Sequence, residues 1–230
     1  MDRSDQHRGV GADLIPRLRD TLARPLPGAA AHRTALPAGE RREVPPGAKL
    51  NYAAVLLALH PDATGKRISF PLVCRPESMP RHAGQVGLPG GALHKGEDAR
   101  SCALREAWEE VGIEPTTVDI VGRLTPVIIP LSRYHVDIMV GWIPERPSLR
   151  RQEGEVLRII HGDPDRMARV GMTRWVTHER SGKVQSFPAF LVEDEIVWGA
   201  TALMLAEFLM LWRGIRGIPH PPAPPANTGK

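Results

Sequence analysis

Residues 91–113 read Gly-Ala-Leu-His-Lys-Gly-Glu-Asp-Ala-Arg-Ser-Cys-Ala-Leu-Arg-Glu-Ala-Trp-Glu-Glu-Val-Gly-Ile, and they carry the strongest pattern in the chain. The segment from Ala99 to Val111 favours a helix, and Gly112 stands where a glycine commonly ends one. The stretch therefore predicts a glycine-bounded loop followed by a helix with a defined end.

The predicted helix carries an unusual group of acidic side chains. Glu106, Glu109 and Glu110 are spaced i, i+3 and i+4, so their carboxylates share one face and repel one another. They also lie near the helix C-terminus, where the dipole disfavours negative charge. A hard divalent cation such as Mg²⁺ would remove this conflict, and Arg105 with Glu97 would form an ion pair that orients the metal ligands. The alternative is an ordinary solvated acidic face.

The full spacing of residues 91–113 resembles the signature of the Nudix hydrolases. It fits G-x5-E-x7-R-E-U-x-E-E-x-G-U, where U is apolar, at every fixed position. The resemblance implies an α/β/α sandwich around a mixed β-sheet. It also implies hydrolysis of a diphosphate linked to another moiety, in which the charge of the diphosphate must be neutralised and a water activated.

The resemblance assigns the metal ligands. Glu106, Glu109 and Glu110 would hold one or more Mg²⁺ or Mn²⁺ ions, and the backbone carbonyl of Gly90 or Gly91 would add a ligand, since glycine permits close approach.

The catalytic roles are less uniform across this family. Arg105 would fix Glu106, with Glu97 in support. The general base would be Glu106 or Glu155, with Glu153 as the rival of Glu155 on the same predicted loop. For Glu153 and Glu155 the alternative is an ordinary solvated loop.

Residues 71–91 resemble the additional motif of the coenzyme A diphosphatase branch of the family. The matching positions are Leu72, Arg75, His82, Gly84, Pro89, Gly90 and Gly91, and the departures are Pro71, Val73, Pro76, Pro80 and Leu88. This similarity implies that Arg75, Arg81 and His82, with Gly90, contact substrate phosphates, including a 3′-phosphate. The alternatives are that Arg75 ends a strand in solvent and that His82 is a structural hydrogen-bond partner.

Three functions follow, in order of preference. The first is metal-dependent hydrolysis of coenzyme A or acyl-CoA to 3′-phospho-AMP and 4′-phosphopantetheine or its acyl derivative. The second is the same chemistry on another nucleoside diphosphate derivative, ADP-ribose or a nucleoside triphosphate. The third is a non-catalytic Nudix-fold binding module. The expected partner is thus a small nucleotide, with no nucleic acid and no membrane, and a homodimer is left open.

Composition excludes several other classes. The net charge is +4, but residues 1–50 hold nine Lys/Arg and six Asp/Glu, whereas residues 51–229 hold twenty of each. A neutral body argues against a general polyanion-binding surface. Glu207 interrupts the best apolar run, and no secretory signal is recognised, so a cytoplasmic location is the default. Cys74 and Cys102 are too few for a disulfide scaffold and are expected to be buried.

The chain divides into three predicted parts. Residues 1–48 form an extension with a short helix through Leu14, Leu18 and Leu22 and a loosely packed, flexible Pro/Gly-rich linker. Residues 49–216 form the Nudix domain, and residues 217–230 a disordered, Pro-rich tail. Within the domain we expect strands at 52–59 and 68–75 (joined as a hairpin), 118–124, 134–143, 174–176 and 190–197, and a helix at 200–212. Tyr134, Trp142 and Trp198 could stack on adenine, although core packing is the commoner use of such aromatic residues.

Overall fold

The computed structural model describes residues 10–37, 40, 44–45, 47–77, 84–180 and 183–222. Its elements are α1 (Leu14–Leu22), α2 (Ala29–His32), the 3-10 helix η2 (Arg33–Ala35), β1 (Asn51–Pro61), β2 (Ile68–Cys74), β3 (Val86–Gly87), β4 (Gly90–Ala92), α3 (Ala99–Val111), the 3-10 helix η3 (Pro115–Thr117), β5 (Asp119–Ile129), β6 (Tyr134–Trp142), β7 (Arg158–Gly162), α4 (Pro164–Val170), β8 (Arg174–Arg180), β9 (Lys183–Val192), β10 (Glu195–Val197) and α5 (Gly199–Arg216).

The main sheet is mixed, as predicted. Its strand order is β3-β2-β1-β6-β5, with β4 paired to β1 and β7 paired to β2. Strands β1 and β6 run parallel, from the pair Asn51/Tyr134 to the pair Leu59/Trp142, and the other pairs are antiparallel. A second sheet of three strands has the order β10-β9-β8.

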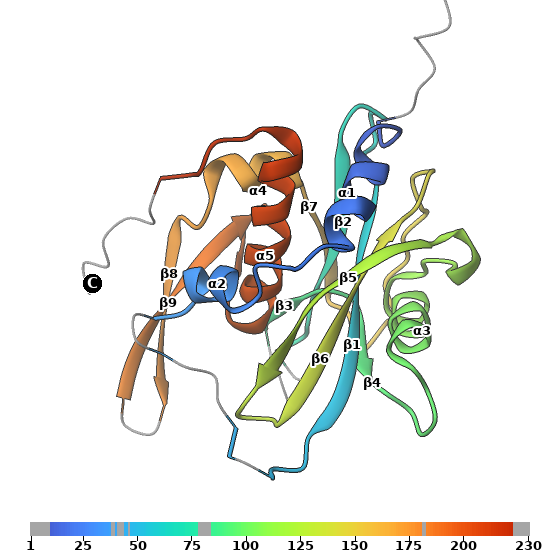
Figure 1. Cartoon of the computed structure of the whole chain (residues 1–230). Helices are drawn as coiled ribbons and strands as arrows, with labels where there is room; N and C mark the ends of the chain where they lie inside the picture. Colours follow the sequence, from blue (N-terminus) through green and yellow to red (C-terminus); the bar gives the residue numbers. More distant parts are fainter. Residues whose placement is uncertain are drawn as a thin grey trace, which may run out of the picture.

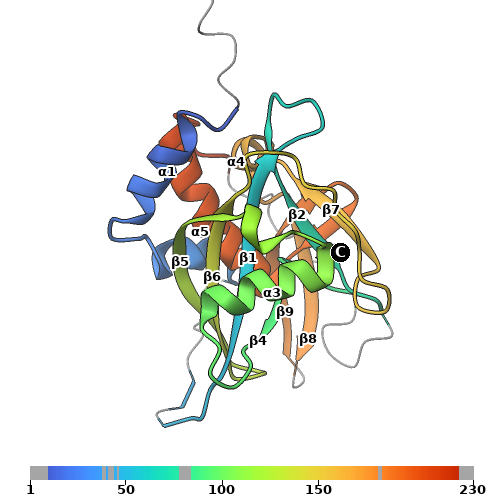
Figure 2. The same ribbon diagram turned by 90° about the vertical axis from the view of Figure 1, so that its right-hand side faces the viewer.

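Helices cover both faces of the sheet formed by β1, β6 and β5. Helix α3 lies on one face, and α1, α2 and α5 lie on the other (Figures 1 and 2). Two separate groups of buried apolar side chains fill the space on the two sides. The α/β/α sandwich is therefore confirmed.

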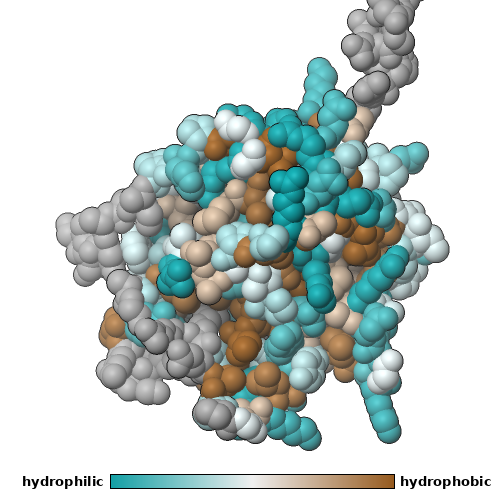
Figure 3. All heavy atoms as spheres, in the orientation of Figure 1, coloured by the Kyte–Doolittle hydropathy of each residue, from teal (hydrophilic) through white to brown (hydrophobic). Residues whose placement is uncertain are grey.

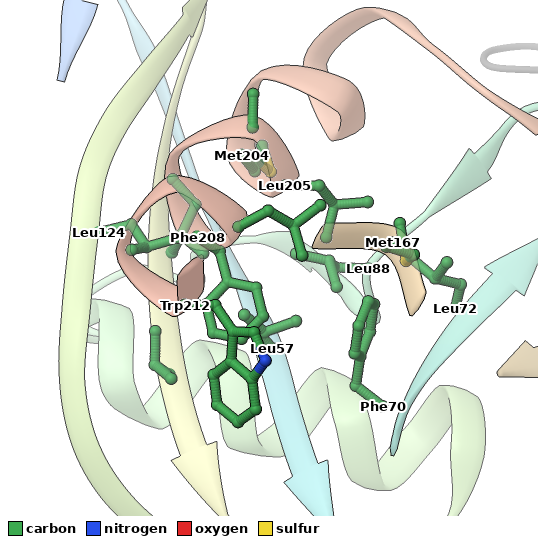
Figure 4. Packing of buried hydrophobic residues seen from close by; sticks show 14 of the residues in the cluster. Leu57, Phe70, Leu72, Leu88, Leu124, Met167, Met204, Leu205, Phe208 and Trp212 are labelled. Carbon is green, nitrogen blue, oxygen red and sulfur yellow. The ribbon is translucent and has the colours of Figure 1, made fainter. Parts of the chain in front are cut away.

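Aromatic side chains fill the core beneath α5. The rings of Phe208 and Trp212 lie 5.5 Å apart, and Phe70 of β2 meets Phe208 edge-on at 6.2 Å (Figure 4). Trp212 is fully buried, and its indole Nε1 donates to Asp165 of α4 at 2.8 Å. This satisfies the polar atom of the largest buried ring and ties α4 to α5.

Small residues bring α3 close to the sheet. Ala103 and Ala107 of the helix and Ala54 and Ala58 of β1 are all fully buried in one cluster. Short side chains on both surfaces let the helix approach the strand that pairs with β4, so the acidic face of α3 is held beside Gly90 and Gly91.

The N-terminal extension is packed, which corrects the prediction of a loose linker. The predicted helix is present as α1, and Leu18 and Leu22 are buried in the core. The following segment was wrongly expected to be flexible, because Ala31 and Ala35 are fully buried and α2 packs against α5. Residues 1–9, 38–39, 41–43 and 46 lie outside the described part of the chain, so this correction covers the other residues of the extension.

Two strand predictions also need correction. Strands β1 and β2 pair only at His60/Ser69 and Pro61/Ile68, beside their connecting turn, and then separate so that β2 pairs with β7 and β3. The single strand expected over 190–197 is divided by a turn in which Glu193 has φ of 51°.

The C-terminal part is ordered further than expected. Ile218 is buried, and a Cβ at Gly171 would lie 2.8 Å from Pro221, so the chain remains packed after α5. Residues 223–230, which hold most of the predicted disordered tail, lie outside the described residues. No helix in the described part is long and apolar enough to cross a membrane.

Candidate active site

Capping interactions fix both ends of α3. The Asp98 side chain accepts a hydrogen bond of 2.7 Å from the Ser101 amide at the start of the helix. At its end Gly112 has φ of 74°, and the amides of Gly112 and Ile113 donate to carbonyls of the last turn. Ile113 is fully buried beyond the cap. The helix is therefore fixed in position along its axis.

Arg105 connects the acidic side chains around α3. Its guanidinium forms a bidentate pair with Glu97, from Nε to Oε1 at 2.8 Å and from Nη2 to Oε2 at 3.0 Å. Its Nη1 donates to Glu106 at 2.8 Å and to Glu109 at 3.0 Å. The pairing of Arg105 with Glu97 is as predicted, and one cation offsets much of the repulsion between these carboxylates.

The pKa values around Arg105 reflect this contact. Hydrogen bonds from Arg105 lower the pKa of Glu97 to about 2, and the amide of His94 donates to the same carboxylate. The same pairing raises the pKa of Arg105 above its already high value. Glu97 and Arg105 are thus both charged at neutral pH, which keeps the arginine aimed at Glu106 and Glu109.

Glu110 lies in a different environment from its two neighbours on the helix. It is 1% exposed, and its Oε2 accepts from the Gly90 amide at 2.9 Å, while its Oε1 accepts from Arg75 Nη2 at 3.0 Å. Its pKa is raised to about 7, chiefly by burial and also by the charges of Glu106 and Glu155, against the opposing effects of Arg75 and the Gly90 amide. Glu110 is a buried acid poised to change charge near neutrality.

The glycine pair of β4 is required by close approach. A Cβ at Gly91 would lie 2.4 Å from Oε1 of Glu106, and a Cβ at Gly90 would lie 2.4 Å from the carbonyl oxygen of Ala54. A side chain at either position would displace the Glu106 carboxylate or the strand. Both glycines therefore lie against the acidic face of α3.

The loop that carries Glu155 is attached to the end of α3. The amide of Arg150 donates to the Val111 carbonyl at 3.0 Å, and the amide of Gln152 donates to the Glu110 carbonyl at 2.9 Å. Val156 is buried, whereas Glu155 and Glu153 are exposed. The backbone bonds place this loop beside the end of α3, and the charge of Glu155 contributes to the raised pKa of Glu110.

A cleft of about 1020 Å³ opens beside the two glycines. Its walls come from β1, β4, the β5–β6 turn, β9 and the start of α5. Many lining residues are apolar, and Figure 3 shows hydrophobic side chains gathered over the β5–β6 turn, where Leu131 is 71% exposed. The volume is at the upper end of the usual range for ligand sites, about 300–1,000 Å³. A large, partly apolar substrate fits this cleft.

The structure separates the three candidate stacking residues. Tyr134 and Trp198 line the cleft, and the Trp198 ring lies 5.6 Å from that of Phe187. Trp142 is not a cleft residue: it ends β6, and a Cβ at Gly11 would lie 2.5 Å from its ring. Stacking by Trp142 is therefore wrong, because the N-terminal segment packs on it. Arg81 and His82 lie outside the described residues.

The predicted metal ligands can be tested against their donor chemistry. In the described ranges no group of three His, Cys, Asp or Glu is arranged closely enough to hold a metal ion. The oxygens instead face arginines, and Arg75 Nη2 bridges Glu110 Oε1 and the Gly90 carbonyl, at 3.0 and 3.3 Å. A cation of the protein thus sits between a carboxylate and a carbonyl, the hard donors that Mg²⁺ and Mn²⁺ prefer. This donor set fits a divalent ion.

Sequence reasoning missed three features of the molecule. Glu207 is fully buried, although its interruption of an apolar helix was a visible signal. Glu40 lines the cleft, and its Oε2 is buried with no hydrogen-bond partner among the described residues. Arg133 lines it from the β5–β6 turn. No local motif marks Glu40 or Arg133, because the fold alone brings them to the cleft.

Comparison with known proteins agrees with the geometry. A family model of the NUDIX domain matches residues 52–188, more than half of the chain. The chain is 33% identical over 165 residues to a Nudix hydrolase, NudL, of Citrobacter koseri, covering 71% of this chain and 83% of the relative. It is 32% identical over 154 residues to NudL of Escherichia coli K12, covering 62% of this chain and 80% of that protein.

Solved structures with a similar fold include a MutT/nudix family protein from Enterococcus faecalis, with 16% identity, a TM-score of 0.48, and coverage of 76% of this chain and 71% of that one. Another is the NUDIX domain of Shewanella oneidensis NrtR complexed with ADP ribose, with 15% identity, a TM-score of 0.43, and coverage of 52% and 77%. Nudix hydrolases generally use divalent ions such as Mg²⁺ or Mn²⁺. From the family match and the relatives, the chain belongs to the Nudix hydrolases, enzymes that act on phosphoric anhydride bonds, and its substrate is a nucleoside diphosphate derivative.

Proposed function

We propose that the protein hydrolyses the diphosphate bond of coenzyme A or acyl-CoA, with Mg²⁺ or Mn²⁺. Water adds across the P–O–P linkage, and the products are 3′-phospho-AMP and 4′-phosphopantetheine or its acyl derivative. The apolar, 1020 Å³ cleft suits a substrate that joins a nucleotide to a long, weakly polar arm.

One contact carries this proposal. Arg75 and Gly90, from the segment resembling the coenzyme A diphosphatase motif, both bond to Glu110 of the Nudix helix. The two motifs are thus parts of one site, at the end of the cleft where Gly91 lies against Glu106. The Arg75 side chain is only 22% exposed and is paired with Glu110. Arg75 therefore does more than end a strand in solvent.

The residues of the chain divide the work of hydrolysis. Arg75 is placed to bind the diphosphate oxygens, since a planar guanidinium can donate to two of them. Arg105 orients Glu106 and Glu109, and Glu97 holds Arg105. These carboxylates, with Glu110 and a carbonyl of Gly90 or Gly91, would hold the metal. A bound divalent ion would neutralise charge on the diphosphate and lower the pKa of water.

We propose Glu155 as the general base. Glu106 is engaged by Arg105 at 2.8 Å, and a carboxylate that binds a metal ion directly is a poorer base. Glu155 is exposed to solvent, and its loop is tied to α3 at Glu110. Its variant Glu155→Gln should lower kcat with little change in KM, whereas Glu153→Gln, the matched control on the same loop, should change neither. Equal losses in both variants would contradict the assignment.

The test of the function is a hydrolysis screen in Mg²⁺ and in Mn²⁺ with product masses resolved. Coenzyme A, acetyl-coenzyme A, ADP-ribose and the nucleoside triphosphates are offered at one concentration. We expect 3′-phospho-AMP from coenzyme A to exceed all other turnover. Preference for another diphosphate would keep the Nudix reaction and overturn the coenzyme A assignment. Binding without turnover of any of them would instead favour a non-catalytic module.

A further inference from the structure

The cleft contains a second arginine at some distance from the acidic helix. Its described lining includes the charged residues Glu40, Arg75 and Arg133. Arg75 is bonded to Glu110 and to the Gly90 carbonyl, so it belongs to the diphosphate end. For Arg133 the structure gives no side-chain hydrogen bond or ion pair within the described ranges, and the residue is exposed.

The register of β1 gives the separation between the two ends of the cleft. Gly90 pairs with Val55, and Tyr134, which follows Arg133, pairs with Asn51. Four residues of strand at about 3.3 Å each place these two points about 13 Å apart. The Arg133 side chain can therefore reach a part of the substrate beyond the diphosphate.

The backbone of Arg133 has an uncommon conformation that is held in place. Its φ is 54°, in the left-handed region, which costs a non-glycine residue about 1 kcal/mol or more. The amide of Asn51 donates to its carbonyl at 2.8 Å. Glycine or asparagine would suit this position better, so the turn itself gives no reason for an arginine.

A second residue with positive φ offers a comparison. Glu193, with φ of 51°, accepts a hydrogen bond of 2.9 Å from the His161 amide, so its side chain links two strands. The Arg133 guanidinium has no such structural use in the described part of the chain. Arg133 lines the cleft and is exposed to solvent.

We infer that Arg133 binds a second anionic group on the substrate, a phosphate monoester separate from the scissile diphosphate, and makes the enzyme favour nucleotides that carry one. This inference rests on the proposed function, because it names the feature by which the same cleft selects its substrate. Arginine suits the role, since its planar fork donates to two phosphate oxygens at once.

The test uses pairs of compounds that differ only in a phosphate monoester. These are coenzyme A with dephospho-coenzyme A, and 2′-phospho-ADP-ribose with ADP-ribose. The test variant is Arg133→Asn, because asparagine tolerates a positive φ. Its kcat/KM for the phosphorylated member should fall about tenfold to a hundredfold, the effect expected when a hydrogen bond to a charged group is lost. The unphosphorylated member should be unaffected. Arg133→Lys should lose less, and Arg123→Gln, an exposed arginine of β5 outside the cleft, should change neither.

Binding of products separates this inference from the proposed reaction. Calorimetry with 3′-phospho-AMP and AMP needs no turnover, so it remains informative even if coenzyme A is not the substrate. The wild type should bind 3′-phospho-AMP more tightly, and Arg133→Asn should abolish the difference. Equal binding of both nucleotides by the wild type, or equal losses on both members of a pair in Arg133→Asn, would overturn the role of Arg133. Unchanged or higher thermal stability of Arg133→Asn would support it, because the arginine then serves no purpose in the fold.

Discussion

Two glutamates of the described part of the chain are buried on opposite sides of the main sheet, and they differ in the hydrogen bonds that they accept. Glu207 of α5 is fully buried, and its carboxylate accepts three hydrogen bonds: from the Gly28 amide at 2.8 Å, the Thr125 amide at 2.9 Å and the Thr125 hydroxyl at 2.7 Å. His32 Nε2 lies 3.5 Å from it. Glu110 of α3 is also buried, but its carboxylate accepts only two hydrogen bonds among the described residues, from the Gly90 amide and from Arg75.

The pKa values of the two acids respond to this difference. Burial alone would raise the pKa of Glu207, but the His32 ring and the hydrogen bonds from Thr125 and Gly28 outweigh it and lower the pKa. Burial raises the pKa of Glu110 to about 7, because its fewer donors do not compensate. The number of fixed donors decides whether a buried carboxylate is a structural anchor or a reactive group.

The largest effect should come from removing the anchor. Glu207→Ala leaves the amides of Gly28 and Thr125 buried without an acceptor, so the free energy of unfolding should fall by about 3–5 kcal/mol. Urea-induced unfolding measures this loss. The kcat of the protein that remains folded should stay near the wild-type value. A loss of kcat without a loss of stability would contradict the structural role of Glu207.

Removing the charge of Glu110 should act on activity instead. Glu110→Gln keeps an acceptor for the Gly90 amide, and Arg75 is partly exposed and can regain water. At pH 4.5, where the carboxyl of folded Glu110 is itself protonated, the free energy of unfolding in chelator should therefore change by less than about 1 kcal/mol. Activity should fall about 10²–10³-fold, as when a group that stabilises transition-state charge is removed. A large loss of stability in metal-free buffer would show that Glu110 is an anchor too.

A pair of glycines sharpens the same contrast. Gly91→Ala places a methyl group against Glu106, so activity should fall about tenfold or more with a small change in stability. Gly28→Ala, at φ of 49° and with its Cβ 3.3 Å from Thr125, should cost about 1 kcal/mol of stability and leave kcat unchanged. Parallel assays of turnover and urea unfolding would show whether the two effects separate.

The smallest effect is a difference in pH dependence, at most about 1.4 kcal/mol per pH unit. Because its pKa is lowered in the folded state, Glu207 should lose its advantage over Glu207→Gln as the pH falls below about 4.5. Because its pKa is raised, Glu110 should lose stability relative to Glu110→Gln as the pH rises from 4.5 to about 7 in chelator. Urea unfolding across both pH ranges should show that the difference in free energy of unfolding between wild type and Gln variant changes with pH in opposite directions at the two sites. A change in the same direction at both sites would contradict the comparison.

The sequence predicted the structure on the α3 side of the sheet better than the contacts on the α5 side. The helix of residues 99–111, its glycine end and the Glu97–Arg105 pair follow from local spacing. The anchor at Glu207 joins residues 28, 125 and 207, which no periodicity connects. For the same reason the packing of the N-terminal extension was missed: its Ala- and Pro-rich composition resembles a linker, and only the tertiary contacts show that Ala31 and Ala35 are buried.

The candidate site was predicted in its chemistry more than in its surroundings. The motif singled out Arg75 but did not predict its contact with Glu110, and the position of Arg133 beside the cleft depends on the pairing of β6 with β1. The proposed functions of these residues remain predictions for the experiments above.

The contacts of Glu207 define how much of the chain belongs to one packed unit. The recurrent NUDIX unit spans residues 52–188, yet this side chain, which lies beyond its end, binds Gly28, which lies before its start. The length matched by the family model is therefore shorter than the length of chain that packs together. A fragment of residues 52–188 would contain α3 but lose this contact between the two flanking segments.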